Sequence, residues 1–308
     1  MATAARMPLY DAHAHLVSAD LVRYPRNKPF VEGATEAAVF GPGTVGRPGG
    51  QHGPEPVNEK PSAEAMRRWM LEQGVEGIAA VQKGMIYGTD NSYIVDAAEA
   101  HPDKMRAIII VDPQANETPD MVRDYARRGV IGIRFFGVGV ENKAVWLSSD
   151  AALRAWSVAD ELGLLVDIEA PAAGSDILIP VVERMADRYP TLRIALDHVF
   201  LPNVNAPHFG IDDRYAGFAR RPNISVKFTS LNMDVIREKG ISPEHVLRRT
   251  VDFYGADKVM WGSDIGTSSG TYAEMIDRAF AATRLLTEDE QRAVLHDTGH
   301  QLMTGWRS

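Results

Sequence analysis

Two histidines one residue apart close the first apolar segment of the chain, at residues 9–16. If this segment is a strand, His13 and His15 point to the same side, because alternate residues of a strand share a face. Two imidazoles that converge in this way can bind a metal ion or polarise an oxygen atom of a substrate. The alternative is that both rings lie under a loop with their hydrogen bonds satisfied. Ionisable residues recur after later apolar segments, which favours the chemical interpretation.

Those later polar residues interrupt or follow the other apolar segments. They are Gln82 and Lys83 after the second, Arg134 in the fourth, Glu169 ending the fifth, Asp197 and His198 ending the sixth, Lys227 in the seventh and Asp264 after the eighth. A charged side chain inside an apolar segment is costly unless it is paired or used. A structural salt bridge is the competing interpretation for each, and it is left open for Lys83 and Lys227. Asp264 and His198 directly follow apolar segments, so we expect both to be catalytic.

Eight short apolar segments, separated by patterns typical of helices, must position these residues. The segments cover residues 9–16, 76–81, 105–111, 130–136, 164–169, 192–197, 223–228 and 257–262. Helices are expected over 63–73, 91–101, 119–128, 150–162, 177–189, 243–254, 272–284 and 288–303, with Ser62 and Ser149 as N-caps. The alternation predicts an α/β fold of the closed (β/α)₈ TIM-barrel type, whose catalytic rim is formed by the carboxyl ends of the strands. A doubly wound open sheet is the alternative, but no GxGxxG motif follows the first segment.

One segment is too long for an ordinary connection between a strand and a helix. Residues 24–61 are rich in Gly and Pro, and they follow the first strand. We expect a functional loop over the mouth of the barrel, with a surface insertion as the alternative. A second long loop is expected at 199–212. Neither has the character of a linker between domains, so residues 1–308 are expected to form a single domain.

Composition excludes several classes of protein. Hydrophobic residues make up 45% of the 308-residue chain, which is ample for a large core, and the net charge of −8 argues against a nucleic-acid partner. No apolar run approaches the roughly 18 residues that span a membrane. The first six residues lack an apolar signal core, and the chain has no cysteine, so we expect a cytoplasmic protein. A homo-oligomer is left open.

Three motifs, in order along the chain, resemble the amidohydrolase superfamily and its amidohydrolase-2 branch. They are Asp11-Ala12-His13-Ala14-His15 at the first strand, Asp197-His198 at the sixth and Trp261-Gly262-Ser263-Asp264 at the eighth. The chain is also similar to the 2-pyrone-4,6-dicarboxylate lactonase group, through Gly132-Ile133-Arg134-Phe135, Glu169-Ala170 and the Gly88-Thr89-Asp90-Asn91 turn. The resemblance implies a barrel hydrolase that opens a lactone. That lactonase group is associated with hydrolysis that needs no metal.

The chain departs from the metal-dependent relatives at two strands. Those relatives place a histidine or a lysine at the end of the fourth or fifth strand, where this chain has Arg134 and Glu169. A two-metal site bridged by a carboxylated lysine is therefore not expected. A site for one divalent ion, with zinc as the best candidate, would use His13, His15 and Asp264, with Glu169 completing it.

The residues themselves suggest how a carbonyl compound would react. Asp264 would act as general base toward water, while His13, His15 and His198, or one metal ion, would polarise the carbonyl. The cations Lys83, Arg134 and Lys227, together with Gln82, would bind a small substrate that bears a carboxylate. We therefore expect a lactone hydrolase. The alternatives are a metal-dependent decarboxylase of an unsaturated carboxylic acid and a barrel that binds carboxylates without catalysis.

Overall fold

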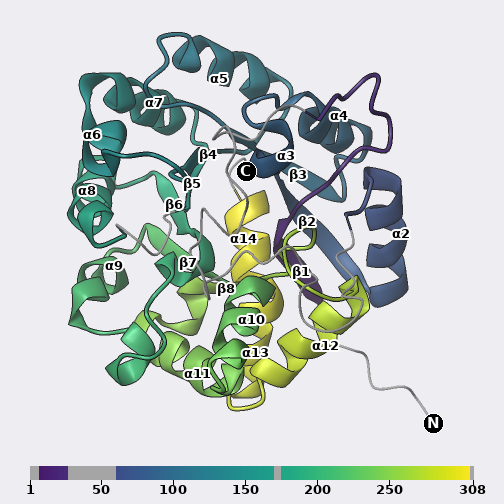
Figure 1. Cartoon of the computed structure of the whole chain (residues 1–308), viewed down its shortest axis with the longest axis vertical. Helices are drawn as coiled ribbons and strands as arrows, with labels where there is room; N and C mark the ends of the chain where they lie inside the picture. Colours follow the sequence, from purple (N-terminus) through teal and green to yellow (C-terminus); the bar gives the residue numbers. More distant parts are fainter. Residues whose placement is uncertain (1–6, 27–59, 170–174, 306–308) are drawn as a thin grey trace.

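The eight apolar segments form eight parallel strands. The computed structural model describes residues 7–26, 60–169 and 175–305. The strands are β1 (Leu9–Ala14), β2 (Val75–Val81), β3 (Met105–Ile110), β4 (Gly132–Phe136), β5 (Leu165–Glu169), β6 (Arg193–Leu196), β7 (Ile224–Thr229) and β8 (Val259–Gly262). Each strand pairs with the next along the chain. The backbone N–H of Asp264 donates to the carbonyl of His13, so the end of β8 returns to β1. The predicted TIM-type barrel is confirmed (Figure 1).

Helices surround the barrel, and most of them cover its outer face (Figure 1). They are α2 (Ala63–Gln73), α3 (Gly84–Tyr87), α4 (Ser92–Ala100), α5 (Thr118–Arg127), α6 (Lys143–Ser148), α7 (Asp150–Glu161), α8 (Ser175–Arg188), α9 (Ala216–Arg220), α10 (Ser230–Glu238), α11 (Pro243–Tyr254), α12 (Tyr272–Ala282), α13 (Glu288–Arg292) and α14 (Thr298–Thr304). The predicted caps are confirmed, since Ser62 accepts from the N–H of Ala65 and Ser149 from that of Ala152. No helix of the described ranges is long and apolar enough to cross a membrane.

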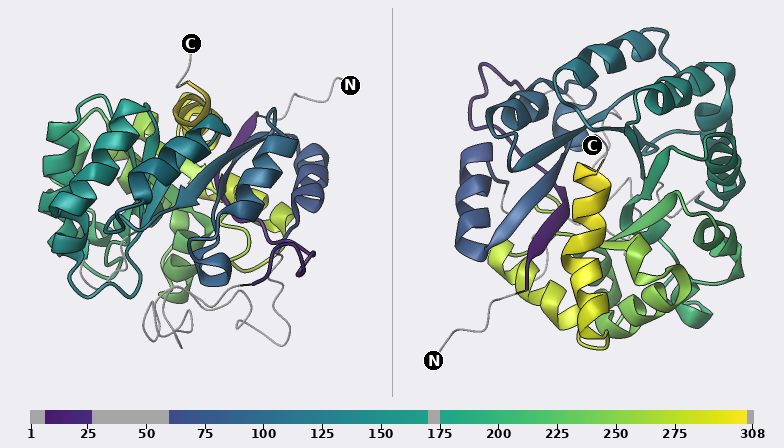
Figure 2. Two further views of the ribbon diagram at one scale, coloured as in Figure 1. Left: turned by 90° about the horizontal axis from the view of Figure 1, so that it is seen from above. Right: turned by 180° about the vertical axis from the view of Figure 1, so that it is seen from behind.

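Apolar side chains fill one end of the barrel. A buried apolar cluster lies inside the ring of strands, and Met303 of α14 packs against it. Its members include Tyr10, Val81, Ile108 and Met260. Figure 2 shows α14 lying across this end, seen from behind. The other end, where the strands finish, is therefore left for the polar side chains.

Two predicted loops follow strands of the barrel. Most of the predicted loop at 24–61 lies outside the described residues. The loop at 199–212 is described, and it contains the short 3₁₀ turn Pro207–Gly210. The predicted last helix is divided into α13 and α14 by a π-helical turn at Ala293–Asp297.

Candidate active site

The carboxyl ends of the strands place most of the predicted site residues in one buried cluster. The members that line a common pocket are His15, Lys83, Arg134, Glu169, His198 and Asp264. Thr267 and the apolar residues Met85, Phe136 and Leu231 complete much of its wall. The empty space between these side chains is about 320 Å³ and includes the part that opens to solvent. The pocket therefore combines charged groups with an apolar wall.

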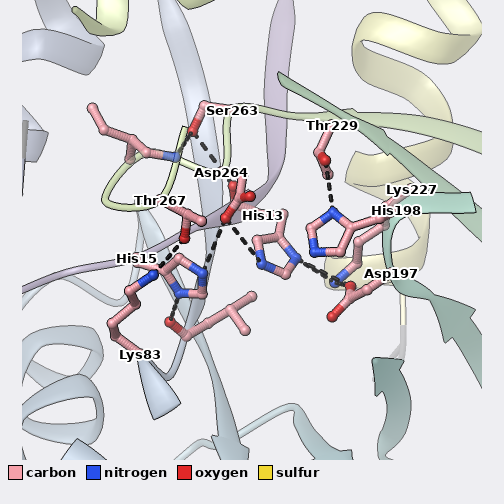
Figure 3. Close-up of polar contacts among 12 residues, drawn as sticks. His13, His15, Lys83, Asp197, His198, Lys227, Thr229, Ser263, Asp264 and Thr267 are labelled. Carbon is pink, nitrogen blue, oxygen red and sulfur yellow. Dashed lines mark hydrogen bonds and ion pairs between the residues drawn. The ribbon is translucent and has the colours of Figure 1, made fainter. Parts of the chain in front are cut away.

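Asp264 lies between the two histidines of the first motif (Figure 3). Its Oδ1 is 3.1 Å from Nε2 of His15 and 3.7 Å from Nε2 of His13. Neither carboxylate oxygen of Asp264, nor Nε2 of His13, has a hydrogen-bond partner among the described residues. These atoms belong to the His13, His15 and Asp264 set, whose ligand atoms all lie within 4.8 Å of one another. Buried polar atoms without partners are rare in proteins, so this convergence indicates a binding function.

The tautomer of His15 suits a metal ligand. Its Nδ1 lies 2.8 Å from the carbonyl oxygen of Val81, which can only accept, so Nδ1 carries the hydrogen. Burial lowers the pKa of His15 well below its ordinary value, and the nearby charges of Lys83 and Arg134 lower it further. The neutral ring then presents a lone pair at Nε2 to the carboxylate of Asp264. Two electron-rich atoms at this separation repel each other unless a cation lies between them, so the set fits a divalent ion.

His13 is held from its other side. Its Nδ1 lies 3.1 Å from Oδ1 of Asp197 and 3.3 Å from Nζ of Lys227. Burial lowers the pKa of His13 to about 3, although the charge of Asp197 opposes this. A carboxylate behind an imidazole is a common support for a metal ligand. His13 fits here because Gly262 has no side chain. A Cβ at Gly262 would come within 2.6 Å of the Cβ of His13.

Glu169, which was expected to complete the ligand set, lies next to Arg134. Glu169 belongs to neither potential metal-ligand group found among the described residues. Its Oε2 lies instead 2.7 Å from Nη2 of Arg134. Burial raises the pKa of Glu169 to about 7, although the charge of Arg134 lowers it. A carboxylate already paired with a guanidinium is a weak partner for a cation.

Arg134 lines the pocket, but its guanidinium is largely engaged by the protein. Its Nε is 2.8 Å and its Nη2 2.7 Å from Oδ2 of Asp197, in addition to the contact with Glu169. Burial disfavours its charge, yet Glu169 and Asp197 raise the pKa of Arg134 above its ordinary value. The predicted fork for a substrate carboxylate is therefore directed mainly at carboxylates of the barrel.

Two other residues predicted to bind substrate lie outside the pocket lining. Lys227 is fully buried below His13, with Nζ 2.5 Å from Oδ2 of Asp167 and 3.1 Å from Oδ1 of Asp197. It thus forms a structural ion pair, which was the competing interpretation. Gln82 donates from Nε2 to the carbonyl oxygen of Asp90 and serves the turn after β2. Neither side chain lines the pocket, and each contacts a protein partner instead.

The carboxylates beneath the histidines were not assigned a role from the sequence. Asp197 was quoted within a motif, and Asp167 was not singled out. Despite burial, Lys227 and His13 hold the pKa of Asp197 well below its usual range. Burial and the charge of Asp197 raise the pKa of Asp167 to about 8. A signal was available for Asp167, because it shares a face of β5 with Glu169, two residues later.

Two site residues have left-handed backbone. Asp264 has φ of 49°, and His198 has φ of 55° at the start of a left-handed run that ends with Leu201. Such conformations are rare for non-glycine residues and cost on the order of 1–3 kcal/mol each. They persist where the surrounding structure imposes them. Nothing in the local sequence signalled them, since no glycine is present in this run.

Comparison with known proteins identifies a family and a set of similar folds. The family described as amidohydrolase matches residues 10–302. No curated protein matches the chain. A probable 2-pyrone-4,6-dicarboxylic acid hydrolase from Acinetobacter baumannii, with citric acid bound, is 17% identical at a TM-score of 0.69, covering 96% of this chain and 99% of that one. An amidohydrolase from Burkholderia multivorans with bound zinc is 15% identical at a TM-score of 0.69, covering 96% and 99%.

One structurally more distant protein is a decarboxylase, not a hydrolase. The 5-carboxyvanillate decarboxylase from Novosphingobium aromaticivorans, with bound manganese, is 16% identical at a TM-score of 0.55 and covers 77% of this chain and 80% of that one. At these identities the likeness concerns the fold. The reaction has to be argued from the site of this chain.

Proposed function

We propose that this chain, which belongs to the amidohydrolase family, opens a cyclic ester bearing a carboxylate by adding water to its carbonyl carbon. The observation that carries the proposal is the state of Asp264. Its side chain is 1% exposed, it lines the pocket, and neither oxygen is hydrogen-bonded by a described residue. An ionised carboxylate in this state is available to take a proton from a water molecule in the pocket.

In the proposed reaction Asp264 accepts a proton as the water oxygen attacks the carbonyl carbon. The ring C–O bond then breaks, and the departing oxygen takes that proton from Asp264. The product is an open-chain hydroxy acid, and the carboxylate of Asp264 is regenerated. Because the new acid ionises at neutral pH, each turnover releases one proton to the solution.

We further propose that His13, His15 and Asp264 hold one divalent ion, for which zinc is the best candidate. When bound, such an ion supplies positive charge that polarises the carbonyl and makes a nearby water more acidic. Direct polarisation by the histidines is the alternative, but it needs an N–H at Nε2. The hydrogen bond from His15 Nδ1 to Val81 leaves the neutral His15 ring without one. The Burkholderia amidohydrolase structure contains bound zinc, which supports zinc as the candidate metal.

Other residues that line the pocket favour a substrate that carries a negative charge and a flat ring. Lys83 is 4% exposed, lines the pocket, and has its Nζ 2.5 Å from Oγ1 of Thr267. An ammonium group held in this way suits a carboxylate of the substrate. Met85, Phe136 and Leu231 offer apolar surface to the ring. The citric acid bound in the Acinetobacter structure is also a small molecule that bears carboxylates.

A panel of carboxylated lactones, with proton release and CO₂ release followed in parallel, tests the proposal. Asp264→Asn should lower kcat for the best lactone by about 10²–10⁴-fold, because it removes the proton acceptor. Asp187→Asn is the matched control. Asp187 lies on the outer helix α8 and pairs with Arg221, so this variant should keep wild-type activity. CO₂ release from an unsaturated acid would establish the decarboxylase alternative instead. Tight binding of a carboxylate with no turnover would identify a non-catalytic barrel.

A further inference from the structure

Two buried residues, Thr229 at the end of β7 and Asn232 in α10, form a closed set of hydrogen bonds with His198. Nδ1 of His198 lies 2.7 Å from Oγ1 of Thr229, and that hydroxyl lies 3.2 Å from Oδ1 of Asn232. The amide nitrogen of Asn232 returns to the carbonyl oxygen of His198 at 2.9 Å. The exposed fractions of the three are 2%, 0% and 6%. Because these side chains have so little access to water, protein groups alone determine which atom carries each hydrogen.

The backbone determines the orientation of the Asn232 amide. Oδ1 accepts from the N–H of Thr229 at 2.9 Å, and Nδ2 donates to the carbonyl of His198. A flipped amide would place oxygen against the carbonyl and NH₂ against the N–H, so both contacts would be lost. Oδ1 of Asn232 is therefore an acceptor next to the hydroxyl of Thr229.

The hydroxyl of Thr229 has a single hydrogen to share between two neighbours. If that hydrogen points to Oδ1 of Asn232, the Thr229 oxygen accepts from an N–H at Nδ1 of His198, and all contacts are satisfied. If it points to His198 instead, two acceptor oxygens face each other at 3.2 Å in a dry environment. The first arrangement is the favourable one. It places the hydrogen of the neutral His198 ring on Nδ1.

The other ring nitrogen faces the reaction site. Figure 3 shows it turned toward His13, on the side of the ring away from Thr229. A neutral ring with its hydrogen on Nδ1 has a lone pair on Nε2.

The same amide also supports the unusual backbone of His198. Residues 198–201 form a left-handed run with φ between 51° and 59°. Its second residue is Val199, and β-branched residues rarely adopt this conformation. The hydrogen bond from Asn232 to the carbonyl of His198 holds the first residue of this run. Asn232 therefore restrains both the ring, through Thr229, and the main chain of His198.

We propose that Thr229 and Asn232 are positioning residues that lock His198 as the Nδ1–H tautomer, so that its Nε2 acts as an electron-pair donor toward the site. This assigns His198 a role different from the one expected from the sequence, since a lone pair cannot donate a hydrogen bond to a substrate carbonyl. Nε2 can instead accept a proton or support a bound cation. The location of His198 in a catalytic site rests on the proposed function, whereas the tautomer does not.

Nitrogen NMR of the full-length protein as purified, labelled with ¹⁵N-histidine, tests the tautomer directly. The chain has nine histidines, and the His198→Gln variant identifies the His198 signals by their loss. At pH 7 the wild type should show a protonated Nδ1 and an unprotonated Nε2, distinguished by their couplings to the ring protons. Thr229→Ser, which keeps the hydroxyl, should retain this pattern, and Thr229→Val should shift the ring toward the other tautomer. An Nε2–H in the wild type, or an unchanged pattern in a folded Thr229→Val protein, overturns the proposal.

Kinetics on the lactone substrate provide a second readout. Loss of a residue that orients a site histidine typically costs about 10–100-fold. Thr229→Val should lower kcat by this factor with little change in KM, and Thr229→Ser should restore kcat to within a few-fold of wild type. Equal losses in the Ser and Val variants would contradict a role for the hydroxyl. If no lactone is turned over, the proposed function fails, but the NMR result still decides the tautomer.

Discussion

Replacing Arg134 by Met separates its structural function from any contact with substrate. Arg134 is 2% exposed and pairs with two buried carboxylates, those of Glu169 and Asp197. Methionine keeps most of the apolar stem and fits a site of similar length, but it has no charge. The two carboxylates then lose their common partner while remaining inside the barrel.

The expected loss of stability follows from what each carboxylate retains. Breaking a buried ion pair by removing one partner costs roughly 3–5 kcal/mol. Asp197 keeps Lys227 at 3.1 Å, and Glu169 can take up a proton because its pKa is already raised to about 7. We therefore expect a loss near the lower limit, about 3 kcal/mol, in the free energy of unfolding at pH 8.

Urea unfolding of paired variants measures this cost. Arg128→Met is the matched control, because Arg128 also pairs with two carboxylates, Asp96 and Glu99, but its side chain is 38% exposed. Exposed ion pairs contribute about 0–1 kcal/mol, so the control should unfold close to the wild type.

The pH dependence of the Arg134→Met effect provides a further check. Lowering the pH from 8 to 5.5 protonates Glu169 in the variant, so the deficit of Arg134→Met should become smaller. A deficit equal to that of Arg128→Met, or one independent of pH, would refute the assignment of Arg134 as the partner of buried charges.

Three further predictions concern other parts of the site. Gly262→Ala would place a Cβ 2.6 Å from the Cβ of His13, so the ring must move, and kcat should fall by about 10²-fold, as measured in steady-state kinetics. Burial raises the pKa of Asp11 to about 6. Because this folded-state pKa lies above the unfolded value, the wild type should lose about 2.4 kcal/mol of stability relative to Asp11→Asn as the pH rises from 4 to 8, in urea unfolding. Chelation should remove at most one divalent ion per chain and abolish activity, as measured by elemental analysis and assay. Two tightly held ions would refute the one-ion site, and full activity without metal would favour direct action of the histidines on the carbonyl.

Much of the fold was predictable because its signals are local. Apolar segments of strand length alternate with helical patterns, and caps such as Ser62 and Ser149 mark where helices begin. In a parallel barrel every strand ends on the same rim. The sequence therefore predicted that His13, His15 and Asp264 would meet, without any knowledge of the distances between them.

The depth of each charged residue was not predictable in the same way. Lys227 lies two residues before the end of β7, and it is directed below His13 toward Asp167. Arg134 lies next to Asp167 in the register of β4 with β5, close enough to the following strand to reach Asp197. Register and stagger decide whether a cation faces the pocket or a carboxylate of the next strand, and neither is encoded within one segment.

The sequence by itself thus determined the barrel, its order of strands and the residue types at its rim. Only the tertiary structure decided how these residues are used: Glu169 pairs with Arg134, and His198 takes a left-handed backbone held by Asn232. The physical reason is the range of the interactions. Periodicity and capping act over a few neighbouring residues, whereas the charge and tautomer of a buried group depend on atoms from other strands that folding brings within about 3 Å.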